Sequence, residues 1–490
     1  MRKITFLFVL SIIGATTFAQ DYETPDSGVN WNLEDMMSAS PETVSNENGT
    51  FIIKENFTVA ENDTLTIEGA IVHLDEGVRI TIEGTFFSLG SEDNINIFDA
   101  SDESEPYDGF RFEEESEAYI DNTTIKNGGG LKVITPDFTI VNSTLAHNVS
   151  GVASGGTIAF SHGSPLVENN TFLENDMPAV SSPANGDVAA RIIDNLIKKN
   201  TQANENRPQI NMGTTGSDTL KIIGNTIIGD RDMDMAGGIA VANLIGGEAN
   251  AVIQGNTITD NRYGITVAGA AYAMIDGNII EDNDTQGDPN LGGSGISVNS
   301  TEDNQTIIAV DNQIRGNLWG ITIIGQGSMN LGDDEDNPGG NVFSDNGNNG
   351  ETFALYNNTP NTIMAKHNCW IEGEEITLDD AAEVIFDQAD DPSLGEVIYD
   401  PMSSECSLSV QEYAKNSIAI YPNPAIDVIR LNNHINLKRV SIYTLNGKRI
   451  QENPLHDGEN TLSVVKLDPG LYLVKLEGDN GTLTKKLIVK

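Results

Sequence analysis

Short runs in which apolar and polar residues alternate recur along the middle of the chain. In Thr257-Ile258-Thr259 and Ile265-Thr266-Val267 an apolar residue alternates with threonine, and Gly, Asn or Asp borders each run. A helix would require apolar residues three and four positions apart, whereas alternation at every second position is typical of a strand. The pattern therefore predicts short β-strands joined by turns.

These runs belong to a repeated unit that begins with an asparagine. An apolar residue follows at the second position after it, and Asn or Asp follows at the fifth. The steps between seven strict copies are 25, 30, 31, 22, 34 and 29 residues, which is the range of repeat architectures. The strict copies begin at Asn170, Asn195, Asn225, Asn256, Asn278, Asn312 and Asn341, and looser ones begin at Asn122, Asn142 and Asn368.

Each copy is too short to bury its own apolar face, whereas stacked copies bury one continuous core. The repeat therefore predicts an all-β parallel β-helix, with Ile and Val pointing inward. We expect the leading Asn to form a sharp corner, because Asn tolerates the left-handed backbone conformation. Stacked about 4.8 Å apart, such side chains can form an Asn ladder. Ligand binding is the alternative role for these residues.

The pattern divides the chain into five segments. Residues 20–49 are polar and weakly patterned and are predicted to lead into the β-helix, which spans 50–406. A linker, 407–416, precedes a last domain at 417–490. The large insertions after the fifth position of the unit are predicted to emerge from one side and to mark a binding face. They are Asp230–Gly237, Asp282–Gly293 and Asn330–Gly340.

The first 19 residues are predicted to be a secretory signal peptide. Arg2 and Lys3 precede the apolar run Ile4–Ile13, and a small residue, Ala19, stands at the expected cleavage site. The run is too short to span a bilayer, and no later stretch has the composition of a membrane helix. The mature protein is expected to be secreted or at the cell surface.

Charge excludes one class of partner. Removing the +2 of Met1–Ala19 and the +3 of Asn416–Lys490 from the chain's −46 leaves −51 on the region between them. Such a field repels nucleic acid and favours cations or basic partners. The change of charge also supports a domain boundary near Asn416.

The β-helical region resembles a known family. The motifs ENDTLTIEGA, GVRITIEGTFFSLG, GNTITDNRYGITV and HNCWIEGEEI are similar to those of right-handed parallel β-helix proteins secreted by bacteria. The resemblance implies that fold over roughly Thr50–Met402. It implies little about chemistry, because this fold carries lyases, hydrolases, epimerases and adhesins.

The last domain resembles the C-terminal sorting domain of the type IX secretion system of Bacteroidetes. The resemblance implies export by that machinery, and short strands with Asn-Gly and Pro-Gly turns independently predict a small antiparallel β-sandwich. An adhesion sandwich is the alternative. The residues that carry the resemblance are Tyr421, Pro422, Asn423, Pro424, Gly447, Gly470, Lys485, Lys486 and Lys490.

No catalytic motif is evident. The polygalacturonase-like set of motifs is absent, and Ser161-His162-Gly163 is only a fragment of it. A pectate-lyase-like site would combine Ca²⁺ with an Arg or Lys base. The arginines of the repeats are candidates for such a site, and solvated outward side chains are the alternative. They are Arg191, Arg207, Arg231, Arg262 and Arg315, of which Arg262 and Arg315 are expected to lie near one another in coil register.

Three further predictions concern side chains. Tyr263 and Trp319, with Arg262 and Arg315, are candidate ligand-binding residues, because aromatic rings stack on sugars. Hard oxygen ligands suit Ca²⁺, so the acidic insertions are candidate cation sites through Asp230, Asp232, Asp234, Asp333, Asp334 and Asp336. Cys369 and Cys406, the only cysteines, either form a disulfide or remain free thiols.

The sequence thus predicts an exported two-domain all-β protein. The first functional hypothesis is glycan binding through the face that carries the acidic insertions. The alternative is a lyase that acts on uronate-containing polysaccharide with Ca²⁺ and an Arg or Lys base. The residues leave open whether the protein is an enzyme.

Overall fold

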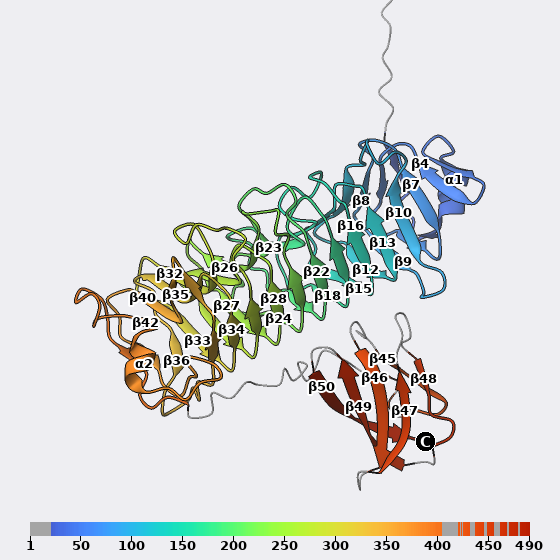
Figure 1. Cartoon of the computed structure of the whole chain (residues 1–490). Helices are drawn as coiled ribbons and strands as arrows, with labels where there is room; N and C mark the ends of the chain where they lie inside the picture. The colour runs from blue at the N-terminus through green and yellow to red at the C-terminus, as the bar shows by residue number, and fades with distance from the viewer. Residues whose placement is uncertain are drawn as a thin grey trace, which may run out of the picture.

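The computed structural model describes residues 21–403 and, in the C-terminal part, residues 420–421, 423, 425–431, 437–444, 448–454, 461–467, 470–478 and 481–490. Residues 21–403 form a parallel β-helix, and the C-terminal residues form two small antiparallel sheets (Figure 1). The predicted fold class is confirmed. The signal peptide and the linker 407–416 lie outside the described residues, so those boundaries stay predictions.

Three long sheets form the walls of the β-helix. Sheet 1 contains β1 (Tyr22–Glu23), β5 (Phe57–Val59), β8 (Arg79–Ile82), β11 (Gly109–Phe112), β14 (Leu131–Val133), β17 (Ile158–Phe160), β20 (Val180–Ser181), β23 (Pro208–Met212), β26 (Gly237–Asn243), β29 (Ile265–Gly269), β32 (Ser294–Ser300), β35 (Trp319–Gly325), β40 (Leu355–Asn358) and β42 (Ile385–Phe386).

Sheet 2 follows sheet 1 along each coil. It contains β2 (Asn30–Trp31), β6 (Thr64–Ile67), β9 (Thr85–Leu89), β12 (Glu117–Asp121), β15 (Asp137–Val141), β18 (Leu166–Glu168), β21 (Arg191–Ile193), β24 (Leu220–Ile223), β27 (Asn250–Gln254), β30 (Tyr272–Asp276), β33 (Thr306–Val310), β36 (Asn330–Gly332), β41 (Ile363–Ala365) and β43 (Val397–Ile398).

Sheet 3 completes each coil before the chain returns to sheet 1. It contains β3 (Val44–Glu47), β4 (Thr50–Ile53), β7 (Ile71–Leu74), β10 (Asn96–Ala100), β13 (Thr123–Lys126), β16 (Thr144–Ala146), β19 (Thr171–Leu173), β22 (Leu196–Lys198), β25 (Thr226–Ile228), β28 (Thr257–Thr259), β31 (Ile279–Glu281), β34 (Gln313–Arg315) and β37 (Val342–Ser344). Its first pair, β3 with β4, is antiparallel.

Equivalent residues of successive coils stack in register along the core. Ile239, Ile265 and Ile296, for example, follow one another on sheet 1. The inward assignment of the apolar residue in each strict copy is confirmed, because all seven side chains are buried. Burial of one such side chain contributes roughly 1.5–3 kcal/mol. The seven are Phe172, Ile197, Ile227, Ile258, Ile280, Ile314 and Phe343.

The leading asparagines form the predicted ladder at the corner between sheets 2 and 3. From Asn170 to Asn368, each side-chain amide donates to the side-chain oxygen of the next coil's Asn at 2.9–3.1 Å. Asn256 also donates to the carbonyl of Ile222 at 2.9 Å and accepts from the backbone N–H of Asn225. Its polar atoms are therefore paired although the residue is buried.

The conformational role predicted for these asparagines was wrong. The left-handed backbone belongs to the preceding residue, for example Asn169, Asp194 and Gly255. The ladder Asn must point its side chain into the stack, so the residue before it makes the sharp turn. The looser copies at Asn122 and Asn142 occupy this turn position, with φ of 46° and 51°, whereas Asn368 joins the ladder.

A second ladder runs along the other edge of sheet 3, where the chain turns towards sheet 1. It connects Asn148, Asn175, Asn200, Gln209, Asn261, Asn283, Asn317 and Asn346 through side-chain hydrogen bonds of 2.6–3.2 Å. The coil of Asn225 has Asp230 where the others have Asn. Gln209 reaches in from β23 instead, accepting from Asn200 and donating to Asn261, so the ladder stays continuous.

The described part of the segment predicted as a lead-in, from Asp21 onward, is folded. It contributes β1, β2 and β3, and helix α1 (Leu33–Ala39) buries Leu33 and Met36 against the end of the core. A buried carboxylate, Asp63, organises this polar segment by accepting from the backbone N–H groups of Asp26, Ser27 and Val29, each at 3.0 Å. Because these contacts are polar, the segment shows no periodic pattern of apolar residues in the sequence.

The other end of the core is closed by aromatic residues and a second helix. Trp370 is buried and stacks on Phe343 with ring centroids 5.0 Å apart. Helix α2 (Leu378–Ala382) begins with a capping box formed by Thr377 and Asp380. Cys369 is disulfide-bonded. The other cysteine, Cys406, lies outside the described residues, so their pairing stays a prediction.

The insertions do not all emerge from one side, contrary to the prediction. Asp230–Gly237 and Asp282–Gly293 connect sheet 3 to sheet 1, whereas Asn330–Gly340 starts in sheet 2 and leads into sheet 3. The third insertion precedes a ladder residue, Asn341, and therefore belongs to a different corner of the coil. Only the first two border sheet 1.

The C-terminal domain consists of two antiparallel sheets with a shared core. One contains β44 (Ile420–Tyr421), β45 (Val428–Leu431) and β48 (Thr461–Ser463). The other contains β47 (Arg449–Pro454), β46 (Leu437–Thr444), β49 (Gly470–Gly478) and β50 (Gly481–Val489). Ile429, Val440 and Leu487 are among its buried residues, and this packing confirms the predicted sandwich.

Candidate functional site: a cationic groove on sheet 1

Sheet 1 carries an outward-facing column of side chains, one from each coil. On β14, Leu131 and Val133 point into the core, so Lys132 between them points out. Strand register places Arg111 before Lys132 in this column and Ala159, Ser181 and Asn211 after it. This part of the column thus holds two basic residues followed by small or polar ones, in a chain that is acidic overall.

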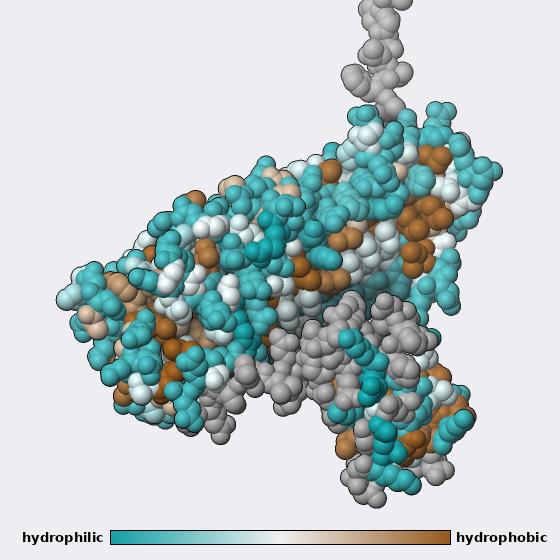
Figure 2. All heavy atoms as spheres, in the orientation of Figure 1, coloured by the Kyte–Doolittle hydropathy of each residue, from teal (hydrophilic) through white to brown (hydrophobic). Residues whose placement is uncertain are grey.

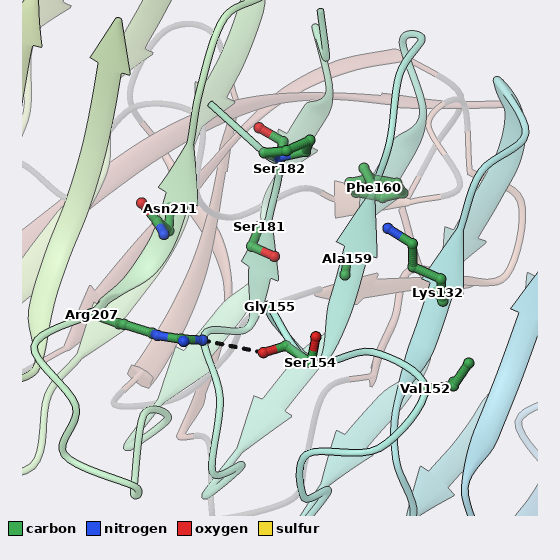
Figure 3. Close-up of a pocket in the computed structure, with 11 residues that line it drawn as sticks. Lys132, Val152, Ser154, Gly155, Ala159, Phe160, Ser181, Ser182, Arg207 and Asn211 are labelled. Atoms are coloured by element: carbon green, nitrogen blue, oxygen red, sulfur yellow. Dashed lines mark hydrogen bonds between the residues drawn. The ribbon is translucent and has the colours of Figure 1, made fainter. Parts of the chain in front are cut away.

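A groove of about 400 Å³ lies along this part of the column (Figure 3). Two cations, Lys132 and Arg207, line it, and none of its lining residues is acidic. This composition is unusual in a chain of net charge −46. The other lining residues are Val152, Ser154, Gly155, Ala159, Phe160, Ser181, Ser182, Pro183 and Asn211.

Glycines allow the wall of the groove to approach the sheet closely. A Cβ on Gly129 would lie 1.9 Å from the carbonyl oxygen of Asp108, so any other residue would collide there. The segment that supplies Val152 and Ser154 hydrogen-bonds to this point, with Val152 donating to Asp108 at 2.9 Å and Ala153 donating to Gly129 at 3.1 Å. The lack of a side chain at Gly129 therefore allows residues 152–154 to pack against the sheet and form this wall of the groove.

Arg207 is held over the groove by contacts to both terminal nitrogens of its guanidinium. Its Nη1 donates to the carbonyl of Ser154 at 3.2 Å, the bond drawn in Figure 3, and lies 3.5 Å from the sulfur of Met177. Nη2 forms a long ion pair of 3.8 Å with exposed Glu205. A planar guanidinium that is fixed in this way can offer its remaining N–H groups to a carboxylate.

Lys132 is the second cation, and its surroundings destabilise its charged form. Burial, and then the positive charge of Arg111, hold the pKa of Lys132 below its ordinary value. Arg111 itself is paired with Glu113. Within the part of the chain that the structure describes, no carboxylate pairs with the Lys132 ammonium. An anionic ligand would supply the missing partner.

Two predicted ligand residues, Arg262 and Tyr263, lie at the corner that leads into β29. Arg262 donates to the carbonyl of Leu291 and to the side chain of Asn206, so it ties two loops together. Tyr263 packs over Gly237, and burial raises the pKa of Tyr263 to about 12. Both side chains thus have structural contacts, and neither lines the groove of Lys132 and Arg207.

The other two predicted ligand residues lie on different sheets. Arg315 ends β34 on sheet 3, where it pairs with Glu281 at 3.0 Å and with Glu372 at 2.6 Å. Its register partner is Glu281, so the expected nearness to Arg262 in coil register was wrong. Trp319 begins β35 on sheet 1 and donates from its indole nitrogen to the carbonyl of Pro289 at 2.9 Å.

The acidic residues of the first insertion mostly have partners. Asp230 lies 3.4 Å from Lys199, and Asp234 accepts from Asn204 at 3.0 Å. Asp232 donates its backbone N–H to Asp230. Arg231 holds Asp260 and Asp284, each at 2.7 Å, and so connects three coils.

The third insertion uses its carboxylates as turn caps. Asp333 accepts from the backbone of Glu335, Asp336 and Asn337, and these bonds, that of Asn337 first, lower the pKa of Asp333 to about 2. Asp334 pairs with Lys366 and His367. Among the described residues no group of three or more His, Cys, Asp or Glu is assembled for a metal ion, and calcium binding stays a prediction.

Sequence reasoning included Arg207 among five arginines but missed Lys132. The two lie 75 positions apart in the sequence, and only the stacking of coils brings them to one groove. The available signal was a lysine between two apolar residues directly after three glycines. That pattern indicates a lysine that points outward from a strand, next to glycines at which another backbone segment can approach closely.

In the C-terminal domain, the structure connects the first and last predicted sorting motifs. The side chain of Asn423 donates to the carbonyl of Lys486 at 2.8 Å and accepts from the N–H of Ile488 at 2.9 Å. Tyr421 lies in β44, Gly470 begins β49, and Lys485 lies in β50, one residue before Lys486. Lys490 donates its N–H to the carbonyl of Ala425. Pro422, Pro424 and Gly447 lie outside the described residues.

Residues 419–490 match the family described as a secretion system C-terminal sorting domain. The chain therefore carries a type IX sorting domain, and export through the periplasm to the cell surface or medium follows, with the type IX machinery as partner. No helix in the described part of the chain is long and apolar enough to cross a membrane. The predicted export is confirmed, whereas the signal peptide stays a prediction.

Comparisons with other proteins concern the β-helix. No curated protein matches the chain. The crystal structure of the periplasmic alginate epimerase AlgG is similar at 14% identity and a TM-score of 0.44, over 77% of this chain and 83% of that chain. An alanine mutant of that epimerase has the same identity and coverage and a TM-score of 0.38. A likeness at this identity concerns the fold alone.

Proposed function

We propose that this exported β-helix binds a carboxylate-bearing polysaccharide, such as a polyuronate, in the groove of Lys132 and Arg207. The observation that supports this proposal is that two cations line one groove and that none of the other lining residues is acidic. Elsewhere the protein is strongly acidic, so the groove is a local positive site in an otherwise negative field. Ser181 and Asn211 add hydroxyl and amide groups that suit sugar hydroxyls.

The test measures the affinity of uronate oligosaccharides by calorimetry. Lys132→Ala and Arg207→Ala should each weaken binding by roughly 10- to 100-fold, because each removes a charge-assisted hydrogen bond. Lys221→Ala is the matched control, since Lys221 is an exposed cation on β24 of sheet 2. Neutral oligosaccharides of the same length should bind weakly. Unchanged affinity in both groove variants would exclude the groove as the site.

A lyase activity is the second candidate, and the lowered pKa of Lys132 favours it. A neutral lysine amine can accept the proton from the carbon beside a uronate carboxyl group, while Arg207 balances the carboxylate charge. The electron pair left on that carbon forms a C=C bond as the bond to the glycosidic oxygen breaks. The departing oxygen takes up a proton from water, and an unsaturated uronate forms. Ultraviolet absorbance of that product, present with the wild-type protein and absent with Lys132→Ala, would identify the activity.

A further inference from the structure

The outward column of sheet 1 continues well beyond the cationic groove. Register pairs connect Lys132 to Tyr356 in eight steps, one for each coil. With strands about 4.8 Å apart, the two side chains lie about 38 Å from each other along the stack. The seven residues between them are all small or of medium size: Ala159, Ser181, Asn211, Ala240, Thr266, Ser297 and Thr322. The column is therefore a low floor with larger residues at its two ends. Asn211, Thr266 and Ser297 in it are partly exposed, whereas its other four middle residues are buried.

The far end of this floor is aromatic. Tyr356 stacks on Phe386, the next residue of the column, with ring centroids 4.8 Å apart and an interplanar angle of 22°. Trp319 lies 4.9 Å from Tyr356 and 4.7 Å from Phe353. All four rings are partly exposed. Partly exposed aromatic residues of this kind offer apolar ring surface on which a sugar ring can pack.

Loops held by arginines border the floor on one flank. The insertions Asp230–Gly237 and Asp282–Gly293 enter sheet 1 at β26 and β32, between the groove and the aromatic end. Arg262 ties Asn206 to Leu291, and Arg231 ties Asp260 to Asp284. The flank is thus fixed by ion pairs and hydrogen bonds before any ligand arrives, which lowers the ordering cost of binding.

We propose that the aromatic cluster of Trp319, Phe353, Tyr356 and Phe386 is a ring-stacking subsite for the same polysaccharide that the cationic groove binds. This inference rests on the proposed function. One glycan chain lies along the column, with a uronate carboxylate at Lys132 and Arg207 and the face of a later sugar ring on Tyr356. Since a sugar residue is about as long as one coil step, a span of about 38 Å requires about eight residues.

The test compares a short uronate oligosaccharide of about four residues with a long one of about ten, chosen to lie below and above that span. The wild-type protein should bind the long ligand about tenfold more tightly. Tyr356→Ala should abolish this advantage and leave the affinity for the short ligand unchanged. Tyr272→Ala is the control, because Tyr272 is an exposed tyrosine on β30 of sheet 2, outside the column.

The outcomes separate this inference from the proposed function. If Lys132→Ala weakens both ligands while Tyr356→Ala changes neither, the groove binds glycan and the aromatic subsite is refuted. If neither Lys132→Ala nor Arg207→Ala changes the affinity for either ligand, the proposed function fails. Melting curves confirm that each variant is folded. As a second measurement, the long ligand alone should change tryptophan fluorescence, and Trp319→Phe should remove that change.

Discussion

The two ladders along sheet 3 and the outward column of sheet 1 are built on the same coils but differ in regularity. Every step of the first ladder, from Asn170 to Asn368, places the same side chain in the same bond. The column changes along its length from cations through small residues to aromatic rings. Residues that repeat therefore hold the stack together, and residues that depart from the repeat give one face its chemistry.

The largest expected effect comes from breaking the repeated core. Ile258→Asp places a carboxylate at a buried position, and an unpaired buried charge should cost about 5 kcal/mol or more. Urea unfolding followed by circular dichroism measures the loss. Thr257→Asp is the control, because the neighbouring side chain points outward. A wild-type transition for Ile258→Asp would overturn the inward register.

The next largest effect is expected from the ladder. Asn256→Ala removes the partners of Asn225, Asn278 and the carbonyl of Ile222, so several buried polar groups lose their hydrogen bonds. We expect a loss of about 2–4 kcal/mol in the free energy of unfolding. Asn290→Ala, in an exposed loop, should be nearly neutral. Equal unfolding midpoints for the two variants would mean that the ladder adds little stability.

Replacing Lys132 in the column should alter the affinity for uronates and leave the free energy of unfolding almost unchanged. The pKa of Lys132 lies below the ordinary lysine value of 10.5, so the side chain loses its charge at a lower pH than a free lysine. Affinity for uronates should therefore fall as the pH rises through that lowered pKa. Lys132→Arg should keep its affinity over the same range, because arginine stays charged. Parallel pH profiles for the two proteins would contradict this assignment.

The smallest effect is expected in the third insertion. The pKa of Asp333 is lowered from 3.8 to about 2, so its contribution to stability is present above the ordinary pKa and is lost as the pH falls towards the lowered one. Asp333→Ala should lower the melting temperature slightly at neutral pH. The curves of the two proteins should converge in strong acid. If the difference in melting temperature between the two proteins grew as the pH fell, the stabilising role assigned to the ionised Asp333 would be wrong.

Much of the fold follows from the sequence because the repeat is local. Alternation around Ile258 and the recurrent Asn define strands and corners without knowledge of distant residues. The N-terminal cap does not follow, since Asp63 organises it through backbone N–H groups and not through an apolar period. The groove does not follow either, because Lys132 and Arg207 meet only through the stacking of coils.

The side chain of Gln209 has a consequence for how freely one loop can change. It enters the second ladder from a strand, so the corner after β25 contributes no amide to the stack. Asp230 is thereby released to face outward, where it contacts Lys199 and Gln202. The exposed part of this loop can accordingly vary without breaking the ladder beneath it, provided that Arg231 keeps its ion pairs with Asp260 and Asp284.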